Sequence, residues 1–372
     1  MKTIILLLVM LSYSIGAICQ ANQDSQLQLK LDQAFANIFS ADAPGGSVFI
    51  QKGKKILYER SFGLADIKTK GKFTPATVAN LGSISKTFVA YGILLLQKQG
   101  KLSVDDNLLE YFPDFKNKAI AQKVTIRHLM SHTSGLPDLR KTGTDSVFYL
   151  TAKDAENFEP LKSADSLEFE PGSHWKYSNP AYNGLALIIE KVTHRKWQDF
   201  IRQNIFQPAH MDHSRITDGA FPESGVAHGY RKVNGVFEEY DYGEYPTFCA
   251  AGNGGVWSSI DDLRKYANAI KTCAFMDCSI IKKTEQVWKP INWSSADPMV
   301  HTTVWFNHKG LMPYYAGEGR FTVIEHTGDQ GGFKAHLLWI PEKEMTIIWI
   351  TNNDLFITDT IEKVLLETGY LQ

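Results

Sequence analysis

The chain has 372 residues, of which 44% are hydrophobic and 21% are charged. These values are close to those of soluble globular proteins and the length suits one large domain or two ordinary ones, which excludes collagen-like, low-complexity and broadly disordered chains. The 39 Lys and Arg residues nearly balance the 40 Asp and Glu residues, so the net charge is −1. Because no basic excess is available to neutralise phosphates, we expect no nucleic-acid partner.

The segment 1–19 is expected to be a secretory signal peptide. Lys2 supplies a positive charge, an unbroken apolar run covers 4–11, and polar sequence begins at Gln20. This pattern is typical of export signals, and the apolar core is shorter than the roughly 20 residues of a comfortable membrane span. We therefore expect a periplasmic or secreted protein with no stable membrane span in the mature chain. The cleavage site, and lipidation at Cys19, are left open.

The mature chain, 24–372, is expected to form one domain with strands near both ends. Two β-rich runs at 46–51 and 55–61 are separated by a turn, which predicts a hairpin. Three more strand-like runs and a closing helix lie near the C-terminus, at 321–325, 333–340, 345–351 and 357–367.

Helical patterns fill the middle of the chain. The run 87–99 is apolar on most faces and predicts a buried helix that ends at Gly100. Further helical patterns lie at 125–131, 181–193, 197–205 and 260–270. Together the elements predict an α/β (α+β) fold, in which an antiparallel sheet flanked by helices is built from both chain ends, about 28–82 and 300–372. A mostly helical part, about 88–290, is inserted between them.

Export would place the cysteines in an oxidising compartment. Cys273 and Cys278 are close enough in sequence for a local disulfide, which the sequence leaves open, while Cys249 is expected to be a small buried residue. His210 and His213 have the spacing of helical metal ligands, but they follow a proline and flank Met-Asp. We interpret them as part of a loop and expect no metal site.

Ser83 and Lys86 stand at the start of the buried helix and could carry nucleophilic chemistry. Residues three apart share a helix face, and the free N–H groups and dipole of a helix N-terminus favour an oxyanion. A lysine beside a serine can act as a base if burial lowers its pKa from about 10.4. Taken alone, Ser-x-x-Lys is a weak signal, because serine often caps helices.

Two further segments gain meaning only together with this one. Alone, Tyr177-Ser178-Asn179 is a loop with aromatic packing, and His326-Thr327-Gly328 marks a glycine-rich bend at a strand end. The order Ser-x-x-Lys, Tyr-x-Asn, basic-Thr-Gly resembles the signature of the serine β-lactamase and penicillin-binding protein superfamily. The chain is most similar to the class C β-lactamase branch, which also holds D-aminopeptidases, D,D-carboxypeptidases and carboxylesterases. The segments 129–137 and 251–259 look like landmarks of that branch, so the resemblance covers essentially the whole mature chain.

The resemblance implies roles for the residues that match. Ser83 would be the nucleophile that takes the acyl group, and Lys86 its activating partner. Tyr177 would relay protons, either as a phenolate or through Lys86. Asn179 would bind a substrate amide and orient Lys86. The motifs Gly-x-Ser-x-Gly and His-Glu-x-x-His do not occur in the chain, which disfavours α/β-hydrolase and zinc-protease chemistry.

The resemblance also implies a substrate-binding strand. Backbone N–H groups of Ser83 and Asp329 would form the oxyanion hole, and Thr327 and Gly328 would form the edge along which an extended substrate lies. His326 departs from the family pattern, since true β-lactamases usually have lysine there. Histidine is mostly neutral above pH ~6.5, and its N–H could donate to an ester or amide oxygen. This favours neutral substrates over β-lactams, although a tolerated substitution with unchanged specificity is the alternative.

These observations predict an exported serine hydrolase that acts through a Ser83 acyl-enzyme on an ester or amide. Carboxylesterase, D-aminopeptidase and D,D-carboxypeptidase activities, on D-amino-acid peptides or esters, all fit. A true class C β-lactamase is one alternative, and a catalytically silent peptidoglycan- or peptide-binding protein is another. We expect a small-molecule or peptide substrate and no cofactor. The oligomeric state stays undetermined.

Overall fold

The computed structural model describes residues 20–216, 226–240, 249–295, 300–310 and 321–372. The predicted signal peptide, 1–19, lies outside these residues. No helix in the described ranges is both long enough and apolar enough to span a membrane.

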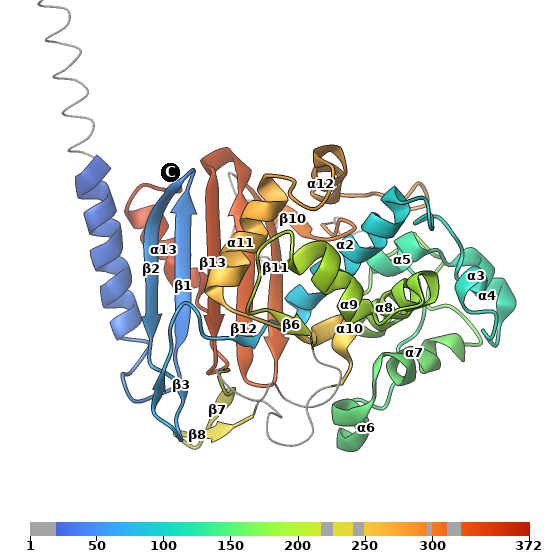
Figure 1. The fold of residues 1–372 in the computed structure, drawn as a ribbon, viewed down its shortest axis with the longest axis horizontal. Coiled ribbons are helices and arrows are strands. Elements are labelled where there is room, and N and C mark those ends of the chain that lie inside the picture. The colour runs from blue at the N-terminus through green and yellow to red at the C-terminus, as the bar shows by residue number, and fades with distance from the viewer. Residues whose placement is uncertain (1–19, 217–225, 241–248, 296–299, 311–320) are drawn as a thin grey trace, which may run out of the picture.

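A six-stranded antiparallel sheet forms the centre of the molecule, in the order β10-β11-β12-β13-β1-β2 (Figure 1). The strands are β1 Gly46–Lys52, β2 Lys55–Phe62, β10 Phe306–Lys309, β11 Thr322–Gln330, β12 Phe333–Ile340 and β13 Met345–Thr351. The N-terminal hairpin joins the C-terminal strands through β1 and β13, where Gly46 lies opposite Thr351. The sheet is therefore built from both chain ends, which confirms the predicted fold class.

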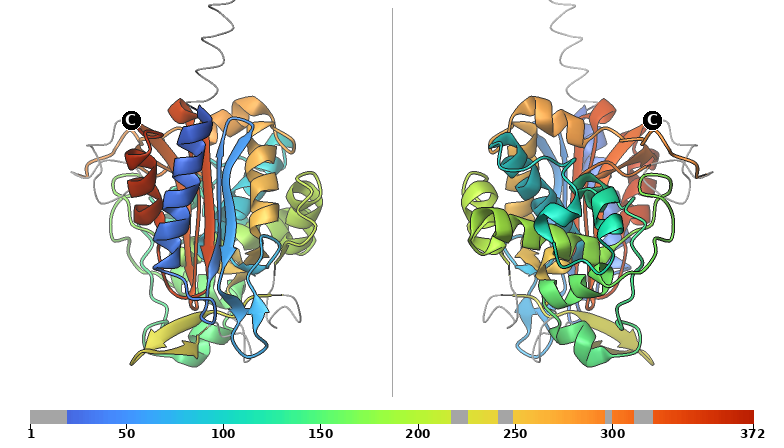
Figure 2. Two further views of the ribbon diagram at one scale, coloured as in Figure 1. Left: turned by 90° about the vertical axis from the view of Figure 1, so that its left-hand side faces the viewer. Right: turned by 90° about the vertical axis from the view of Figure 1, so that its right-hand side faces the viewer.

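Both faces of the sheet are covered, and this explains why its inner strands are apolar without alternation. All seven residues of β13 are buried. On one face lie the helix at 20–36 and α13, Thr358–Glu367, side by side (Figure 2). Leu31 and Phe35 of the first helix share a buried cluster with Trp349 of β13.

The helical part covers the other face and is centred on α2, Ser85–Lys98. Every residue of α2 from Ser85 to Leu96 is buried, and the helix ends as predicted, with Gly100 at φ +67°. α8, Asn179–Thr193, packs against α2, and α11, Ile260–Lys271, packs against β13 and β1. The remaining short helices are α3 Leu108–Tyr111, α4 Lys118–Lys123, α5 Ile126–Met130, α6 Ser146–Thr151, α7 Asp154–Lys162, α9 Trp197–Ile201, α10 Ala251–Gly254 and α12 Cys278–Thr284.

Two predicted elements differ from the structure. The helical pattern at 197–205 is divided, since α9 ends at Ile201 and a π-helical turn, Arg202–Phe206, follows. The strand predicted at 321–325 continues to Gln330, because every residue from Ile324 to Gln330 pairs with β12. The glycine-rich segment expected to bend is thus regular strand, and it forms part of the candidate site described below.

Small sheets that the sequence did not indicate surround this frame. β5, Ala79–Asn80, pairs with β9, Val256–Ser258, which also pairs with β6, Arg215–Ile216. Two hairpins complete the set: β3 Leu64–Asp66 with β4 Gly71–Lys72, and β7 Tyr230–Val233 with β8 Val236–Glu239. The pairing of β5 with β9 matters most, because β5 leads directly into the turn that carries Ser83.

The cysteines and surface complete the description. Cys273 and Cys278 form a disulfide between α11 and α12, and Cys249 is buried. His210 lies in a turn after the π-helical segment, as the loop interpretation predicted.

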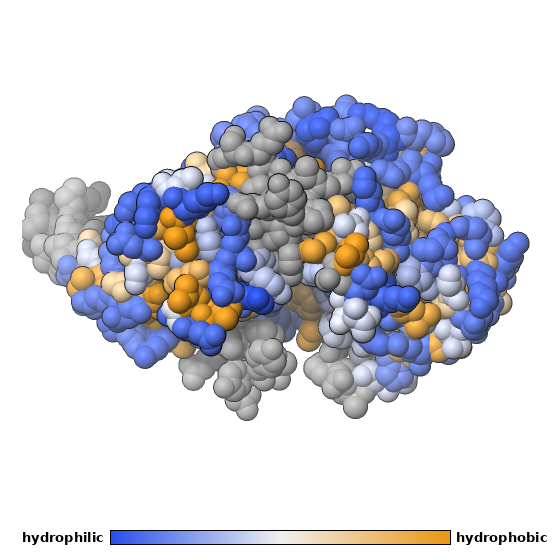
Figure 3. All heavy atoms as spheres, turned by 90° about the horizontal axis from the view of Figure 1, so that it is seen from below, coloured by the Kyte–Doolittle hydropathy of each residue, from blue (hydrophilic) through white to orange (hydrophobic). Residues whose placement is uncertain are grey.

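Seen from below, polar residues surround several separate groups of apolar ones on the coloured surface (Figure 3).

Candidate active site

Ser83 lies in a 3-10 turn, Gly82–Ile84, immediately before α2, rather than inside the helix. The turn is held by backbone and side-chain hydrogen bonds: Leu81 N donates to the Val256 carbonyl at 2.9 Å, and Gly82 N donates to Asn80 Oδ1 at 2.7 Å. Gly82 has φ +50°, a left-handed conformation that disfavours residues with a Cβ. The local sequence therefore places the Ser83 hydroxyl at a fixed point between the sheet and α2.

Lys86 is fully buried beside Ser83. Its Nζ lies 2.8 Å from Ser83 Oγ and donates to the backbone carbonyl of Asn253 at 2.7 Å. Burial lowers the pKa of Lys86 well below its ordinary value, and the positive charge of Arg140 lowers it further. A neutral amine in contact with a serine hydroxyl is able to take its proton.

The ring of Tyr177 faces the same amine, with Lys86 Nζ 5.1 Å from the ring centroid. Burial raises the pKa of Tyr177, and a hydrogen bond with the Ser83 side chain offsets only part of that rise. The resting phenol is consequently neutral. Tyr177 could serve as a base either as a phenolate or through Lys86. The raised pKa disfavours a phenolate in the resting enzyme, and the nearness of Lys86 favours proton transfer through that amine.

His132 fixes the position of Tyr177, a contact that sequence reasoning missed. The two rings pack with centroids 4.4 Å apart, and His132 Nδ1 accepts a hydrogen bond from Ser178 N at 3.1 Å. His132 lies in the segment 129–137, which the family resemblance marked as a landmark without assigning it a role. That landmark was the only sequence signal that could have pointed to it.

Asn179 does not hold Lys86 in the way that the resemblance implied. It is the first residue of α8 and is half-buried. Within the described ranges, Lys86 hydrogen-bonds to Ser83 and Asn253, and no hydrogen bond joins it to Asn179. The orientation of Lys86 comes instead from Asn253, on α10, for which the sequence offered no specific signal beyond the Gly-Gly turn around it.

The strand β11 packs directly on the turn that carries Ser83. A Cβ on Gly328 would lie 1.9 Å from the carbonyl oxygen of Leu81, and a Cβ on Gly82 would lie 2.5 Å from Asp329 N. The structure thus brings the Asp329 amide next to the nucleophile turn, while the Asp329 side chain pairs with Lys334. Thr327, half-buried, lies between Gly328 and His326 on the same strand. Backbone N–H groups at this junction are able to stabilise an oxyanion.

His326 is buried, and its contacts identify the tautomer. Its Nδ1 lies 2.7 Å from the carbonyl oxygen of Thr327, which can only accept, so Nδ1 carries the proton. Burial lowers the pKa of His326 to about 3, so the ring is neutral. Its Nε2 is consequently an acceptor, and it has no hydrogen-bond partner among the described residues. The expectation that His326 presents an N–H to the substrate is therefore wrong.

His301 repeats this arrangement nearby. Its Nδ1 contacts the carbonyl of Thr302, burial lowers its pKa to about 4, and its buried Nε2 is also without a partner among the described residues. The ring packs against His132 and Phe306, with centroids 4.6 Å away in each case. Phe306 in turn contacts His326. The site thus has an aromatic wall with acceptor nitrogens, which the sequence did not indicate.

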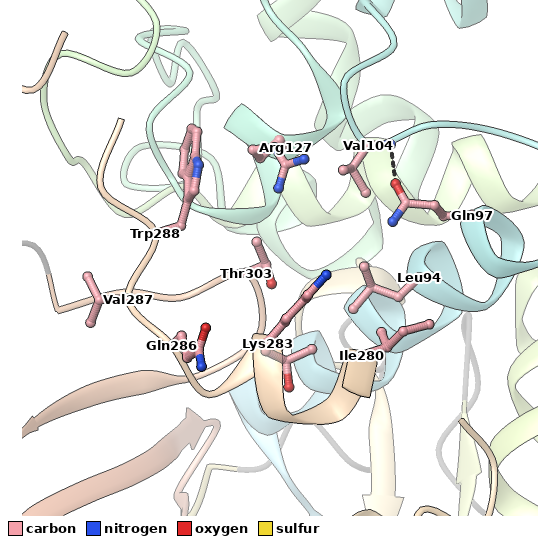
Figure 4. Close-up of a pocket in the computed structure, with 11 residues that line it drawn as sticks. Leu94, Gln97, Val104, Arg127, Ile280, Lys283, Gln286, Val287, Trp288 and Thr303 are labelled. Carbon is pink, nitrogen blue, oxygen red and sulfur yellow. Dashed lines mark hydrogen bonds between the residues drawn. The ribbon is translucent and has the colours of Figure 1, made fainter. Parts of the chain in front are cut away.

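A separate pocket lies away from these residues. It has a volume of about 400 Å³, lies between α2, α5 and α12, and is lined by Leu94, Arg127 and Trp288 among others (Figure 4). None of the predicted catalytic residues lines it. Across the described segments, no group of three or more His, Cys, Asp or Glu side chains could hold a metal ion.

Sequence comparisons with known proteins find relatives over most of the chain. The sequence profile of the family described as Beta-lactamase matches residues 30–365. Penicillin-binding protein 4* of Bacillus subtilis (strain 168) is 29% identical over 323 residues, which cover 83% of this chain and 68% of that protein. Protein flp of Staphylococcus aureus (strain COL) is 32% identical over 192 residues, which cover 50% of this chain and 38% of flp.

Solved structures share the fold. The octameric penicillin-binding protein homologue from Pyrococcus abyssi matches with a TM-score of 0.75 and 23% identity, over 93% of this chain and 77% of that one. The D-amino acid amidase from Ochrobactrum anthropi SV3, in complex with L-phenylalanine amide, matches with a TM-score of 0.74 and 21% identity, over 94% and 98% of the two chains.

Proposed function

The chain belongs to the β-lactamase family of serine hydrolases, and from this premise we propose that it cleaves an ester or amide through an acyl-enzyme on Ser83. The observation that carries the proposal is the contact of 2.8 Å between Ser83 Oγ and the buried amine of Lys86. A lysine held neutral by burial can activate a serine that is unreactive at its ordinary pKa.

In the proposed reaction, Lys86 accepts the hydroxyl proton as Ser83 Oγ bonds to the carbonyl carbon. The oxyanion is stabilised by the N–H groups of Ser83 and Asp329. When the tetrahedral intermediate collapses, the bond to the leaving group breaks and Tyr177 passes it a proton, which Lys86 replaces. A water molecule then attacks the acyl carbon and gives a proton to the Lys86–Tyr177 pair. As the bond between the acyl carbon and Ser83 Oγ breaks, the pair returns that proton to Oγ, and the carboxylic acid leaves.

We further propose that the substrates lack a carboxylate beside the scissile bond, as amides or esters of amino acids do. The neutral ring of His326 supports this proposal, because a carboxylate would gain most from a cation. The likeness to a D-amino acid amidase supports D-amino-acid derivatives as the first class to test. A class C β-lactamase is disfavoured by the same neutral His326.

Export is part of the proposal. The charge and apolar run within 1–19 are typical of a signal peptide, and the disulfide between Cys273 and Cys278 fits an oxidising compartment. We propose that the mature protein works in the periplasm or outside the cell. Fractionation of cells followed by N-terminal sequencing of the mature protein tests this directly.

Covalent labelling tests the mechanism. A fluorophosphonate probe is expected to attach to Ser83, and Ser83→Ala is expected to lower turnover of p-nitrophenyl acetate and D-alanine p-nitroanilide by several orders of magnitude. Mass spectrometry of the labelled peptide identifies the site. An adduct on another residue, for example Ser134, or full activity in Ser83→Ala would overturn the proposal.

A further inference from the structure

Three buried polar side chains form a hydrogen-bonded chain that ends at Lys86. Asn183 Nδ2 donates to Asp154 Oδ1 at 2.6 Å, and Asn253 Nδ2 donates to Asn183 Oδ1 at 2.8 Å. The backbone carbonyl of the same Asn253 then accepts from Lys86 Nζ at 2.7 Å. Asp154, Asn183 and Asn253 are 7%, 0% and 4% exposed, so water does not compete effectively for these bonds.

Asp154 is the fixed end of the chain. Its carboxylate accepts from Asn183, from Gly252 N at 2.8 Å and from Trp197 Nε1 at 2.9 Å. Burying a carboxylate is costly unless donors surround it, and these three donors come from α8, α10 and α9. Three separate elements are therefore held to one side chain at the start of α7.

Two of these bonds hold Asn253 and its neighbour Gly252, and the backbone carbonyl of Asn253 is the one that accepts the hydrogen bond from Lys86. Asp154 holds the backbone N–H of Gly252 directly and holds the side chain of Asn253 through Asn183. These two anchors hold the backbone that precedes Asn253 and the Asn253 side chain, and so restrain the Cα atom from which the Asn253 carbonyl extends. The third bond, to Trp197, leads away from the site toward α9 and has no part in this clamp.

We propose that Asp154 is a positioning residue for the reaction, which fixes the Asn253 carbonyl and through it the Nζ of Lys86 against Ser83. This inference rests on the proposed role of Lys86 as the base. Displacement of a reacting group by about 1 Å can cost on the order of 100-fold in rate, so a loose Asn253 carbonyl would slow acylation rather than weaken substrate binding.

The test compares two variants that each remove one donor to Asp154. Asn183→Leu breaks the branch toward Lys86, and Trp197→Phe breaks the branch away from it. We expect Asn183→Leu to lower kcat on p-nitrophenyl acetate, and the rate of fluorophosphonate labelling, by at least tenfold with KM changed less than about threefold. Trp197→Phe is expected to lower Tm while keeping kcat within about threefold. Equal losses in both variants, or full activity in Asn183→Leu, would refute the inference.

A rescue experiment keeps the test decisive if Asn183→Leu does not fold. In Asp154→Asn, an amide oxygen facing Asn183 and Gly252 leaves the amide N–H₂ facing the Trp197 N–H, so two donors oppose each other. Adding Trp197→Phe removes that conflict and leaves both clamp bonds on the amide oxygen, so the double variant is expected to keep kcat within about threefold of Trp197→Phe alone. A loss of tenfold or more in the double variant counts against positioning by Asp154. Failure of the probe to label Ser83 in the wild type would instead refute the proposed function.

Discussion

Gly82 and Asp329, 247 positions apart by their numbers, are in direct backbone contact, since a Cβ on Gly82 would lie 2.5 Å from Asp329 N. Gly82 belongs to the nucleophile turn and Asp329 to β11. The gap between them is therefore set by the absence of a side chain. This contact holds the two backbone amides of the proposed oxyanion hole at a common point.

Gly82→Ala is expected to abolish most activity, because the added methyl must push β11 away from Ser83. Gly100→Ala is the matched control: Gly100 also has positive φ, +67°, but nothing lies within 4 Å of its Cβ position. The control should lose only about 1 kcal/mol of unfolding free energy to left-handed strain and keep its kcat. Urea unfolding and kcat on p-nitrophenyl acetate measure both effects. Equal kcat in the two variants would show that β11 tolerates the methyl.

Lys86 and Tyr177 should behave as one proton-transfer unit. Each single change, Lys86→Met or Tyr177→Phe, is expected to cost most of the activity, and the double variant little more, because both residues serve the same proton. The double-mutant cycle in kcat/KM measures the coupling. Losses that simply add would mean that the two residues act independently.

His326 should govern the preference between neutral and anionic substrates. Because its pKa is lowered to about 3, the ring stays neutral from pH 5.5 to 9, and its titration should not change the ratio of p-nitrophenyl acetate to nitrocefin turnover in that range. His326→Lys is expected to shift the kcat/KM ratio toward nitrocefin about tenfold, equivalent to ~1.4 kcal/mol. An unchanged ratio in the variant, or strong nitrocefin turnover without esterase activity in the wild type, would contradict this account.

Asp154 should leave a signature in the pH dependence of stability. Burial raises the pKa of Asp154 from 3.8 to about 6. The hydrogen bonds from Gly252, Asn183 and Trp197 act in the opposite direction but are outweighed by burial. The folded state then holds a proton that the unfolded state releases, so this contribution to stability is fully present below pH ~4 and is lost as pH rises through about 6. The unfolding free energy of wild type, relative to Asp154→Asn, should fall by roughly 2.5 kcal/mol between pH 4 and 7. A difference that stays constant with pH would argue that Asp154 is already charged at pH 4.

Local patterns in the sequence were enough to predict the frame of the molecule. The strands at 333–340 and 345–351 lie where predicted, since both faces of the sheet are covered and the runs are continuously apolar. The buried helix that follows Ser83 was equally clear, because α2 contacts protein on nearly all sides. Ser83 and Lys86 meet because they are three residues apart at the start of this helix, a relationship that needs no tertiary information.

The surroundings of these residues depended on long-range packing. The partner that orients Lys86 is the carbonyl of Asn253, 167 residues away in the chain, and a backbone carbonyl carries no mark in the sequence. The tautomer of His326 follows from one backbone oxygen that faces its ring, and its neutrality follows from burial. Residue identity sets which groups can react. The pKa, tautomer and orientation of those side chains depend on desolvation and on contacts that exist only after distant segments have packed together.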